Sequence, residues 1–465
     1  MSADEEVVSL GSREHSPPVS QPNRGTRAAL VTLGCKINSF ESAAMAQALA
    51  QDSWAIVDSS QTADLYVINS CTVTAEADRQ TRQAVGRVLR KNPSARVVLT
   101  GCYAQNDPER CAEIPGVSLV VGNDQKNNVA PLVRDLLAGQ GKTPAIHVDR
   151  LTGLPPALLR GYEDHTRAFV QVQQGCDQAC TFCVIHRARG PSYSFAQADI
   201  LKQVHEFLDA GYRELVICGV DLGSYEHDAT VPPETSLALV NLLRKIASVP
   251  GEFRVRLSSI DPVHLTDDLL DLIGSDARFC PYLHVSVQSG STLILKRMKR
   301  RYDREFLIGR LAAARDKING LVLGADIMAG FPTESDGDFE ATASLVQEAN
   351  IIYPHVFPFS ARPGTPAAKI PKQIPKPERK RRAAELRRLG VTLRQSALET
   401  MRGANGSLLV EREVIASTSV AYHGRLQNYM PVRLESGDAA SGEMRSVHIS
   451  GVASEVLIAR VNGSA

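Results

Sequence analysis

Apolar runs that end in a cysteine alternate with helix-patterned segments over the first third of the chain. Residues 28–35 read AALVTLGC, residues 64–71 read DLYVINSC and residues 95–102 read ARVVLTGC. A segment with the periodicity of an amphipathic helix follows each run. Continuous apolar strands alternating with helices are typical of a parallel sheet covered on both faces. The pattern predicts a doubly wound α/β domain over residues 27–150.

The three cysteines of this region occupy the same position in successive units. Cys35, Cys71 and Cys102 each stand where a predicted strand ends. Loops at the carboxyl ends of parallel strands converge on one crevice, so we expect the three thiols to meet. Three thiolates suit an iron–sulfur cluster with one iron left open. Unrelated thiols and a cobalamin module are the alternatives, and the Asp-x-His-x-x-Gly signature of a cobalamin module is absent from the sequence.

Strand and helix patterns continue, in longer units, from residue 160 to residue 395. Six segments are expected to be strands: residues 168–175, 214–220, 253–260, 282–289, 321–331 and 353–360. Six strands predict a partial (β/α)6 barrel, with the chemistry at the carboxyl ends of the strands. Polar residues and glycines gather at those ends: Cys176, Gly219, Asp221, Ser259, Asp261, Gln288, Ser289, Gly330, Ser360 and Arg362.

The loop after the first of these strands reads QQGCDQACTFCVIHRARGPS. Its cysteines are Cys176, Cys180 and Cys183, and His186 follows three residues later. Three cysteines and a histidine form a recognised closed zinc site. Three thiolates alone would leave one iron of a four-iron cluster open to another ligand. The loop therefore holds either zinc or iron.

Composition narrows the class of protein. The 465 residues carry 52 Lys and Arg against 51 Asp and Glu, so no global field attracts nucleic acid and any basic surface is local. No apolar stretch reaches 18 residues, so no membrane association is expected. Nine cysteines and the absence of an export signal argue against a disulfide framework and predict a cytoplasmic protein. Residues 1–26 are expected to be a disordered tail.

Residues 369–394 form a basic arm with a net charge of +8, for which we favour contact with a nucleic-acid backbone over a solvated linker helix. Residues 400–465 have short strand patterns and predict a small β-barrel of the oligonucleotide-binding kind, which resembles a TRAM domain. Its near-neutral charge would make recognition depend on specific contacts. The expected RNA-binding residues are Arg379, Lys380, Arg381, Arg382, Arg387, Arg388 and Tyr429.

Several motifs resemble those of the radical S-adenosylmethionine methylthiotransferase family. They are TLGCKINSFES, NSCTVTAEAD, TGCYAQ, the Cys-x-x-x-Cys-x-x-Cys loop with Phe182, RLSSIDP, HVSVQSGS and GFPTES. The resemblance implies two [4Fe-4S] clusters, one on Cys176, Cys180 and Cys183 that cleaves S-adenosylmethionine, and an auxiliary one on Cys35, Cys71 and Cys102 that carries the sulfur. It further implies that Phe182, Gly219, Ser259 and Gln288 line the S-adenosylmethionine site. The implied partners are the tRNA anticodon stem–loop, a sulfur donor, and a reduced flavodoxin- or ferredoxin-type electron donor.

The substrate branch is read from the residues around the first two cysteines. Lys36-Ile37-Asn38 and CTVTAEAD resemble the branch that methylthiolates N6-threonylcarbamoyladenosine at tRNA position 37. The threonyl carboxylate of this nucleoside is anionic, so a cationic side chain such as Lys36 beside the auxiliary cluster could pair with it. Isopentenyladenosine tRNA and a ribosomal protein side chain are the alternative substrates. His186-Arg187 replaces the Pro-Tyr of many relatives, which keeps a non-enzymatic zinc RNA-binding protein as a further alternative.

Overall fold

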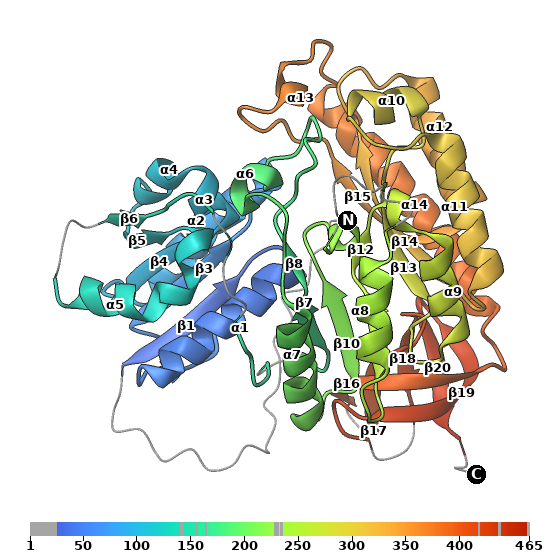
Figure 1. Ribbon diagram of the computed structural model, residues 1–465, viewed down its shortest axis with the longest axis horizontal. Helices are drawn as coiled ribbons and strands as arrows, with labels where there is room; N and C mark the ends of the chain where they lie inside the picture. The colour runs from blue at the N-terminus through green and yellow to red at the C-terminus, as the bar shows by residue number, and fades with distance from the viewer. Residues whose placement is uncertain are drawn as a thin grey trace.

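The computed structural model describes residues 26–139, 144–151, 153, 157–162, 165–226, 232, 236–416, 419–435 and 439–462. The expected tail, apart from Thr26, lies outside these residues. An N-terminal sheet, a central curved sheet and a C-terminal barrel follow one another along the chain (Figure 1). Among the described residues, no helix combines the length and the apolar character needed to cross a membrane.

The N-terminal sheet is parallel, with the order β2-β1-β3-β4-β5-β6. Its strands are β1 Arg27–Thr32, β2 Ala55–Ile56, β3 Leu65–Ser70, β4 Arg96–Gly101, β5 Val117–Val121 and β6 Ala145–His147. The helices are α1 Lys36–Gln51, α2 Ala75–Lys91, α3 Cys102–Asn106, α4 Pro108–Ala112 and α5 Val129–Leu137, with a short 3-10 turn at Asn123–Asn128. The predicted α/β architecture is confirmed for this part of the chain.

Alternate side chains of β3 pack into two separate hydrophobic cores, one on each face of the sheet. Leu65 and Val67 pack with residues of α1 and α5, whereas Tyr66 and Ile68 pack with residues of α2. Successive side chains of a strand point to opposite faces, so a run such as LYVI must be apolar at every position when both faces are covered. From β1 the chain adds β2 on one side and then β3 on the other, so the order of strand addition switches between β1 and β3. Ligand crevices in such parallel sheets form at this switch point.

The central part is an open barrel of parallel strands, in two sheets ordered β11-β10-β7 and β12-β13-β14-β15. The strands are β7 Ala168–Gln171, β10 Glu214–Cys218, β11 Arg254–Leu257, β12 Ser259–Ile260, β13 Tyr282–Gln288, β14 Val322–Ala329 and β15 Ile351–Pro358. The third predicted strand is broken at Ser258, whose N–H still donates to Ile217 O of β10, whereas Ser259 and Ile260 already pair with β13. The predicted six-stranded partial barrel is confirmed, with this break added.

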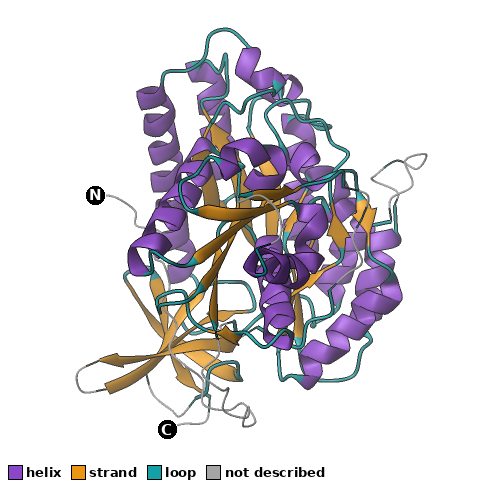
Figure 2. Ribbon diagram, turned by 90° about the vertical axis from the view of Figure 1, so that its left-hand side faces the viewer, coloured by secondary structure: helices purple, strands orange, loops and turns teal. Residues whose placement is uncertain are grey.

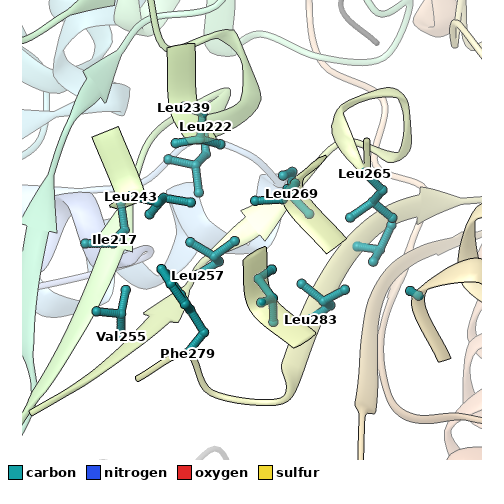
Figure 3. Packing of buried hydrophobic residues seen from close by; sticks show 14 of the residues in the cluster. Ile217, Leu222, Leu239, Leu243, Val255, Leu257, Leu265, Leu269, Phe279 and Leu283 are labelled. Carbon is teal, nitrogen blue, oxygen red and sulfur yellow. The ribbon is translucent and has the colours of Figure 1, made fainter. Parts of the chain in front are cut away.

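Helices cover the outer face of the open barrel. They include α7 Gln197–Asp209, α8 Ala238–Ala247, α9 Asp267–Ser275, α11 Arg304–Lys317, α12 Asp336–Glu348 and α14 Lys376–Glu399; shorter turns are α6 Ile185–Arg189, α10 Thr292–Arg297 and α13 Pro366–Lys369. Figure 3 shows Leu239 and Leu243 of α8 packed over Ile217, Val255 and Leu257 of the strands. Leu283, Val285 and Val287 of β13 belong to the same core. The alternation leaves Tyr282, His284, Ser286 and Gln288 on the inner face.

The C-terminal part is a closed barrel with the strand order β16-β17-β18-β20-β19 (Figure 2). Its strands are β16 Asn405–Ala416, β17 Ser419–Leu426, β18 Pro431–Leu434, β19 Met444–Ala453 and β20 Val456–Val461. Arg254 of the central sheet donates hydrogen bonds to Ser407 O and Arg425 O of this barrel. Polar contacts of a buried guanidinium fix the barrel against the amino ends of the central strands.

Candidate active site

Two glycines let the three N-terminal cysteine loops approach one another. Gly34 and Gly101 have φ of +103° and +97° and stand directly before Cys35 and Cys102. A side chain at position 34 would place its Cβ 2.8 Å from Cys71 Cβ and 3.1 Å from Cys71 Sγ. Only glycine combines this backbone with that approach. The loops after β1 and β3 are therefore in contact beside their cysteines.

The electrostatics of Cys71 are consistent with three thiols in one neighbourhood. Burial, followed by the charges of Cys102 and Cys35, raises the pKa of Cys71 to about 12. Thiols bind metal as thiolates, and a cationic centre removes both the burial cost and the mutual repulsion. This donor set fits an iron–sulfur cluster, because three soft sulfur ligands converge where free thiolates would be unfavourable.

The second cysteine trio lies in the loop between β8 Gln173–Gln174 and α6. Cys176 N–H donates to Gly190 O and Cys183 N–H donates to Cys180 O, both at 3.1 Å, so the loop folds on itself. Burial, and then the charge of Cys180, raises the pKa of Cys183 to about 11. Arg300 donates from Nη1 to Cys180 Sγ at 3.3 Å. Three partly buried sulfurs beside a guanidinium fit a cluster of net negative charge.

Arg189 links the two trios. From the end of α6 its Nε donates to Cys102 Sγ at 3.2 Å, and its Nη2 donates to Glu41 Oε2 at 3.1 Å. It also contacts Asn38, and its side chain is only 2% exposed. Lys126 pairs with the same Glu41 carboxylate. The loop that carries one trio is thus fastened to the helix and strand ends that carry the other.

The charge of Glu41 is secured by these partners. Burial alone would raise the pKa of its carboxyl group, but Arg189 and Lys126 hold it at about 2. Lys126 has a lowered pKa, first because it is buried, while Glu41 opposes that shift. Because the carboxylate pKa lies far below neutrality, the Arg189–Glu41 pair is an ion pair at physiological pH.

A second fastening lies at the far edge of the open barrel. Arg362, after β15, donates from Nη2 to Thr72 Oγ1 at 2.7 Å and to Asp78 Oδ2 at 2.6 Å. Ser360 Oγ accepts a hydrogen bond from Ala75 N at the start of α2, at 3.0 Å. Sequence patterning put these two residues on the rim of a cofactor site. The structure instead uses them to dock the N-terminal domain.

The residues expected to line the S-adenosylmethionine site lie at or near the carboxyl ends of the central strands. Gln288 has φ +64° and a buried Oε1 without a hydrogen-bond partner among the described residues. At Gly219 a Cβ would come within 2.9 Å of Leu222 Cα. Ser259 lies 3.5 Å from Asp326 Oδ2, and Phe182 packs beside Met298 and Phe331. The orphaned amide oxygen of Gln288 is the feature that most directly favours a bound polar ligand here.

His186 does not join a metal-binding group. Its Nδ1 is buried without a partner among the described residues, and burial followed by the charge of Arg187 lowers its pKa. No three described His, Cys, Asp or Glu side chains close around a single ion. A four-iron cluster is wider than one ion, so this finding concerns zinc and leaves the cysteine trios open.

We predict that His186→Ala retains full iron loading. Among the described residues the imidazole Nδ1 has no hydrogen-bond partner, so we expect its loss to remove no ligand. Iron and sulfide analysis of the anaerobically purified variant beside wild type checks this. Loss of about half of the iron, or stoichiometric zinc in the wild-type protein, would restore the zinc interpretation.

Most of the arginines expected to bind RNA are already engaged within the protein. Arg382 is 4% exposed and forms ion pairs with Glu334, Asp336 and Glu378, so its assignment to RNA is corrected to structural. Arg381 is exposed but pairs with Glu378 and Glu385, because the helix presents these carboxylates three and four residues away. Arg379 and Arg387 donate to carbonyl oxygens of β15 and its loop. Lys380 and Arg388 remain exposed on the arm.

The ring of Tyr429 also packs against other residues of the protein. Its ring lies 4.8 Å from that of Tyr282, and the guanidinium of Arg425 lies 4.2 Å from its centroid. Burial would raise its pKa, but the charges of Arg425, Arg167 and Lys36 lower it to about 8. Tyr282 and Arg425 both contact the ring, so the structure places Tyr429 at the contact between the barrel and the central sheet, and its binding to RNA stays a prediction.

Sequence reasoning missed Arg189 and Arg300 as parts of the site. Arg189 lies inside the conspicuous cysteine loop and directly precedes Gly190, which has φ +73°. Its position inside the cysteine loop was the one feature of the sequence that could have indicated a role for Arg189 in the site. Arg300 lies in the basic stretch KRMKRRY, and nothing in the sequence distinguishes it from the neighbouring lysines and arginines that do not contact Cys180.

Two family models match the chain. Residues 27–122 match the uncharacterized protein family UPF0004, and residues 170–346 match the radical SAM superfamily. The threonylcarbamoyladenosine tRNA methylthiotransferase MtaB of Rickettsia prowazekii is 36% identical over 420 residues, 88% of this chain and 91% of that protein. The tRNA-2-methylthio-N(6)-dimethylallyladenosine synthase of Syntrophotalea carbinolica is 31% identical over 354 residues, 75% of this chain and 80% of that protein.

A solved structure shares the fold at low identity. The radical S-adenosylmethionine methyltransferase TsrM of Kitasatospora setae, with cobalamin and a [4Fe-4S] cluster bound, superposes with a TM-score of 0.54 at 13% identity. The match covers 84% of this chain and 78% of that one. It shows a shared fold over that part of the chain. The relatives, at 31% identity or more over most of both chains, show that the chain belongs to the radical S-adenosylmethionine tRNA methylthiotransferase family.

Proposed function

We propose that the protein methylthiolates C2 of N6-threonylcarbamoyladenosine at position 37 of tRNA. The observation that carries the proposal is the pair of cysteine trios, on facing loops, joined through Arg189. The resemblance of the sequence to threonylcarbamoyladenosine tRNA methylthiotransferases over most of its length supports the choice of nucleoside.

The chain's own residues would hold two clusters and one cofactor. Cys176, Cys180 and Cys183 would hold one [4Fe-4S] cluster, and Cys35, Cys71 and Cys102 the other. When bound, these groups supply the electron that cleaves S-adenosylmethionine and the site from which sulfur is transferred, chemistry that side chains cannot provide. Gln288 would bind the polar end of S-adenosylmethionine through its unpaired amide oxygen. The glycine at 219 would leave room beside it.

Substrate choice would depend on Lys36, which lies next to Cys35 and is exposed. Burial raises the pKa of Cys218 to about 12, and the charge of Lys36 opposes that rise. After Arg425 and Arg167, the same charge helps to lower the pKa of Tyr429, and the two groups belong to the inner face and floor of the open barrel. The ammonium group therefore faces the space between the N-terminal domain and the barrel. A carboxylate-bearing adenosine entering this space would meet a cation beside the auxiliary cysteines, whereas an isopentenyl group would gain nothing from it.

We propose a sulfur donor and a reduced flavodoxin- or ferredoxin-type electron donor as further partners, since both sulfur and reducing equivalents are consumed.

Deleting the gene and analysing the nucleosides of bulk tRNA by mass spectrometry tests the proposal. We expect 2-methylthio-N6-threonylcarbamoyladenosine to disappear and its unthiolated precursor to accumulate. Wild-type protein should restore the product, and Lys36→Met should restore it less well than Lys36→Arg. Loss of the isopentenyl analogue, or of a methylthio group from ribosomal protein with tRNA unchanged, would refute the substrate assignment.

A further inference from the structure

Helix α2 carries a row of arginines that neither the cluster site nor the basic arm explains. Arg79, Arg82, Arg87 and Arg90 recur at helical spacing on the face opposite the buried Thr81, Ala84, Val85 and Val88. With Gln83 and Gly86 they line a surface hollow of ≈ 470 Å³, and none of these lining residues is acidic. From Arg79 to Arg90 the row spans twelve residues, or about 16 Å of helix.

Two arginines of this row, Arg87 and Arg90, are available for an anion. Arg79 pairs with Glu76, and Arg82 contacts Tyr103 OH at 3.3 Å. Among the described residues no carboxylate lies within ion-pair distance of Arg87 or Arg90, and both are exposed. The hydrogen bond from Arg79 lowers the pKa of Glu76, and the charges of Lys376 and Lys380 add to that effect. The first turn of α2 therefore lies near the exposed lysines at the start of α14.

Gly86 gives the hollow an open floor. Glycine in a helix interior costs about 1 kcal/mol relative to alanine. Internal packing does not require it, because an added Cβ would meet only the tip of the Arg90 side chain, at 3.4 Å. A helix backbone left bare between arginines allows close approach by a phosphodiester chain, whose phosphates the guanidinium groups can bind in bidentate fashion.

The position of α2 determines where the arginine row runs relative to the cysteine crevice. The helix begins at Ala75, four residues after Cys71, and its first turn is docked to the barrel edge by Ser360 and Arg362. The arginines then lead away from the cysteine crevice. We infer that the arginine row of α2 binds the phosphate backbone of the RNA substrate while the target nucleoside lies in the crevice. This inference rests on the proposed function, and it adds a backbone track outside the basic arm.

The test uses the full-length protein with both clusters reconstituted and a fluorescent, unmodified anticodon stem–loop RNA. Backbone contacts do not depend on the nucleoside, so this probe separates the inference from the substrate assignment. Arg82→Gln/Arg87→Gln/Arg90→Gln should weaken binding about tenfold or more and reduce the salt slope of log K by about two to three. Lys202→Gln/Arg244→Gln/Lys245→Gln on α7 and α8, with the same charge change, should bind like wild type.

A second variant guards against a folding artefact. Gly86→Gln should raise helix stability, because glutamine is the better helix former, and yet weaken RNA binding by filling the hollow. Equal losses in the α2 and control triples would overturn the inference. So would unchanged RNA binding combined with slower reduction by an acidic electron-transfer protein, which would assign the row to that partner. If wild type itself failed to bind any RNA, the proposed function would fail together with the inference.

Discussion

Cys176→Ala, Cys180→Ala or Cys183→Ala should abolish the cleavage of S-adenosylmethionine, whereas Cys35→Ala, Cys71→Ala or Cys102→Ala should spare cleavage and stop methylthiolation. The physical reason is that the two trios lie on different loops and each would hold its own cluster. Every variant should bind about four iron atoms per chain in place of about eight. The measurements are iron content, 5′-deoxyadenosine formation and the methylthiolated nucleoside.

Cys111→Ala serves as the matched control, since Cys111 is buried in the core below α2 and belongs to neither trio. It should keep full iron and both activities. If all six variants lost cleavage alike, and wild type held a single cluster, the division of labour between the trios would be refuted.

Arg189→Met should have the second-largest effect, on stability as well as on chemistry. The substitution keeps most of the side-chain volume but leaves the Glu41 carboxylate with Lys126 as its remaining cationic partner. Losing one partner of a buried ion pair costs about 3 kcal/mol or more. Trp54 is the single tryptophan of the chain and is buried in the N-terminal domain, so its fluorescence during denaturant unfolding reports on that domain.

Arg187→Met, two residues earlier on the same short helix and exposed, is the control and should unfold like wild type. Arg189→Lys should recover part of the stability, because it restores the charge without the forked geometry that reaches Cys102, Asn38 and Glu41 together. An unfolding midpoint of Arg189→Met equal to that of Arg187→Met would show that the link between the domains is not an energetic one.

The sequence predicted the architecture well where hydrophobic pattern decides it. The uninterrupted run LYVINS announces a strand buried on both faces, and the six central strands each end in polar or glycine residues that mark one rim. The break at Ser258 was not predictable, since the residues around it pair with different neighbours and that choice belongs to tertiary structure.

Charged side chains were the less predictable part of the site. Arg382 and Arg388 are equivalent in a count of basic residues, yet one is buried among carboxylates and the other is exposed. Ser360 and Arg362 sit on the correct rim but bind the neighbouring domain. The net charge of a segment gives only its balance of cations and anions. Which cations remain free to bind a ligand depends on the carboxylates and carbonyl oxygens that other segments place beside them in the fold.

The two fastenings of the N-terminal domain restrict how a large substrate can reach the crevice. Arg189 holds one edge of the open barrel and Arg362 the other, each through a buried guanidinium. A hinge that lifted this domain would have to strip both ion pairs at once. We therefore expect a folded polynucleotide to bind without lifting of this domain, with the nucleotide turned out of its loop toward the cysteine trios, so that the conformational cost of recognition falls on the nucleic acid.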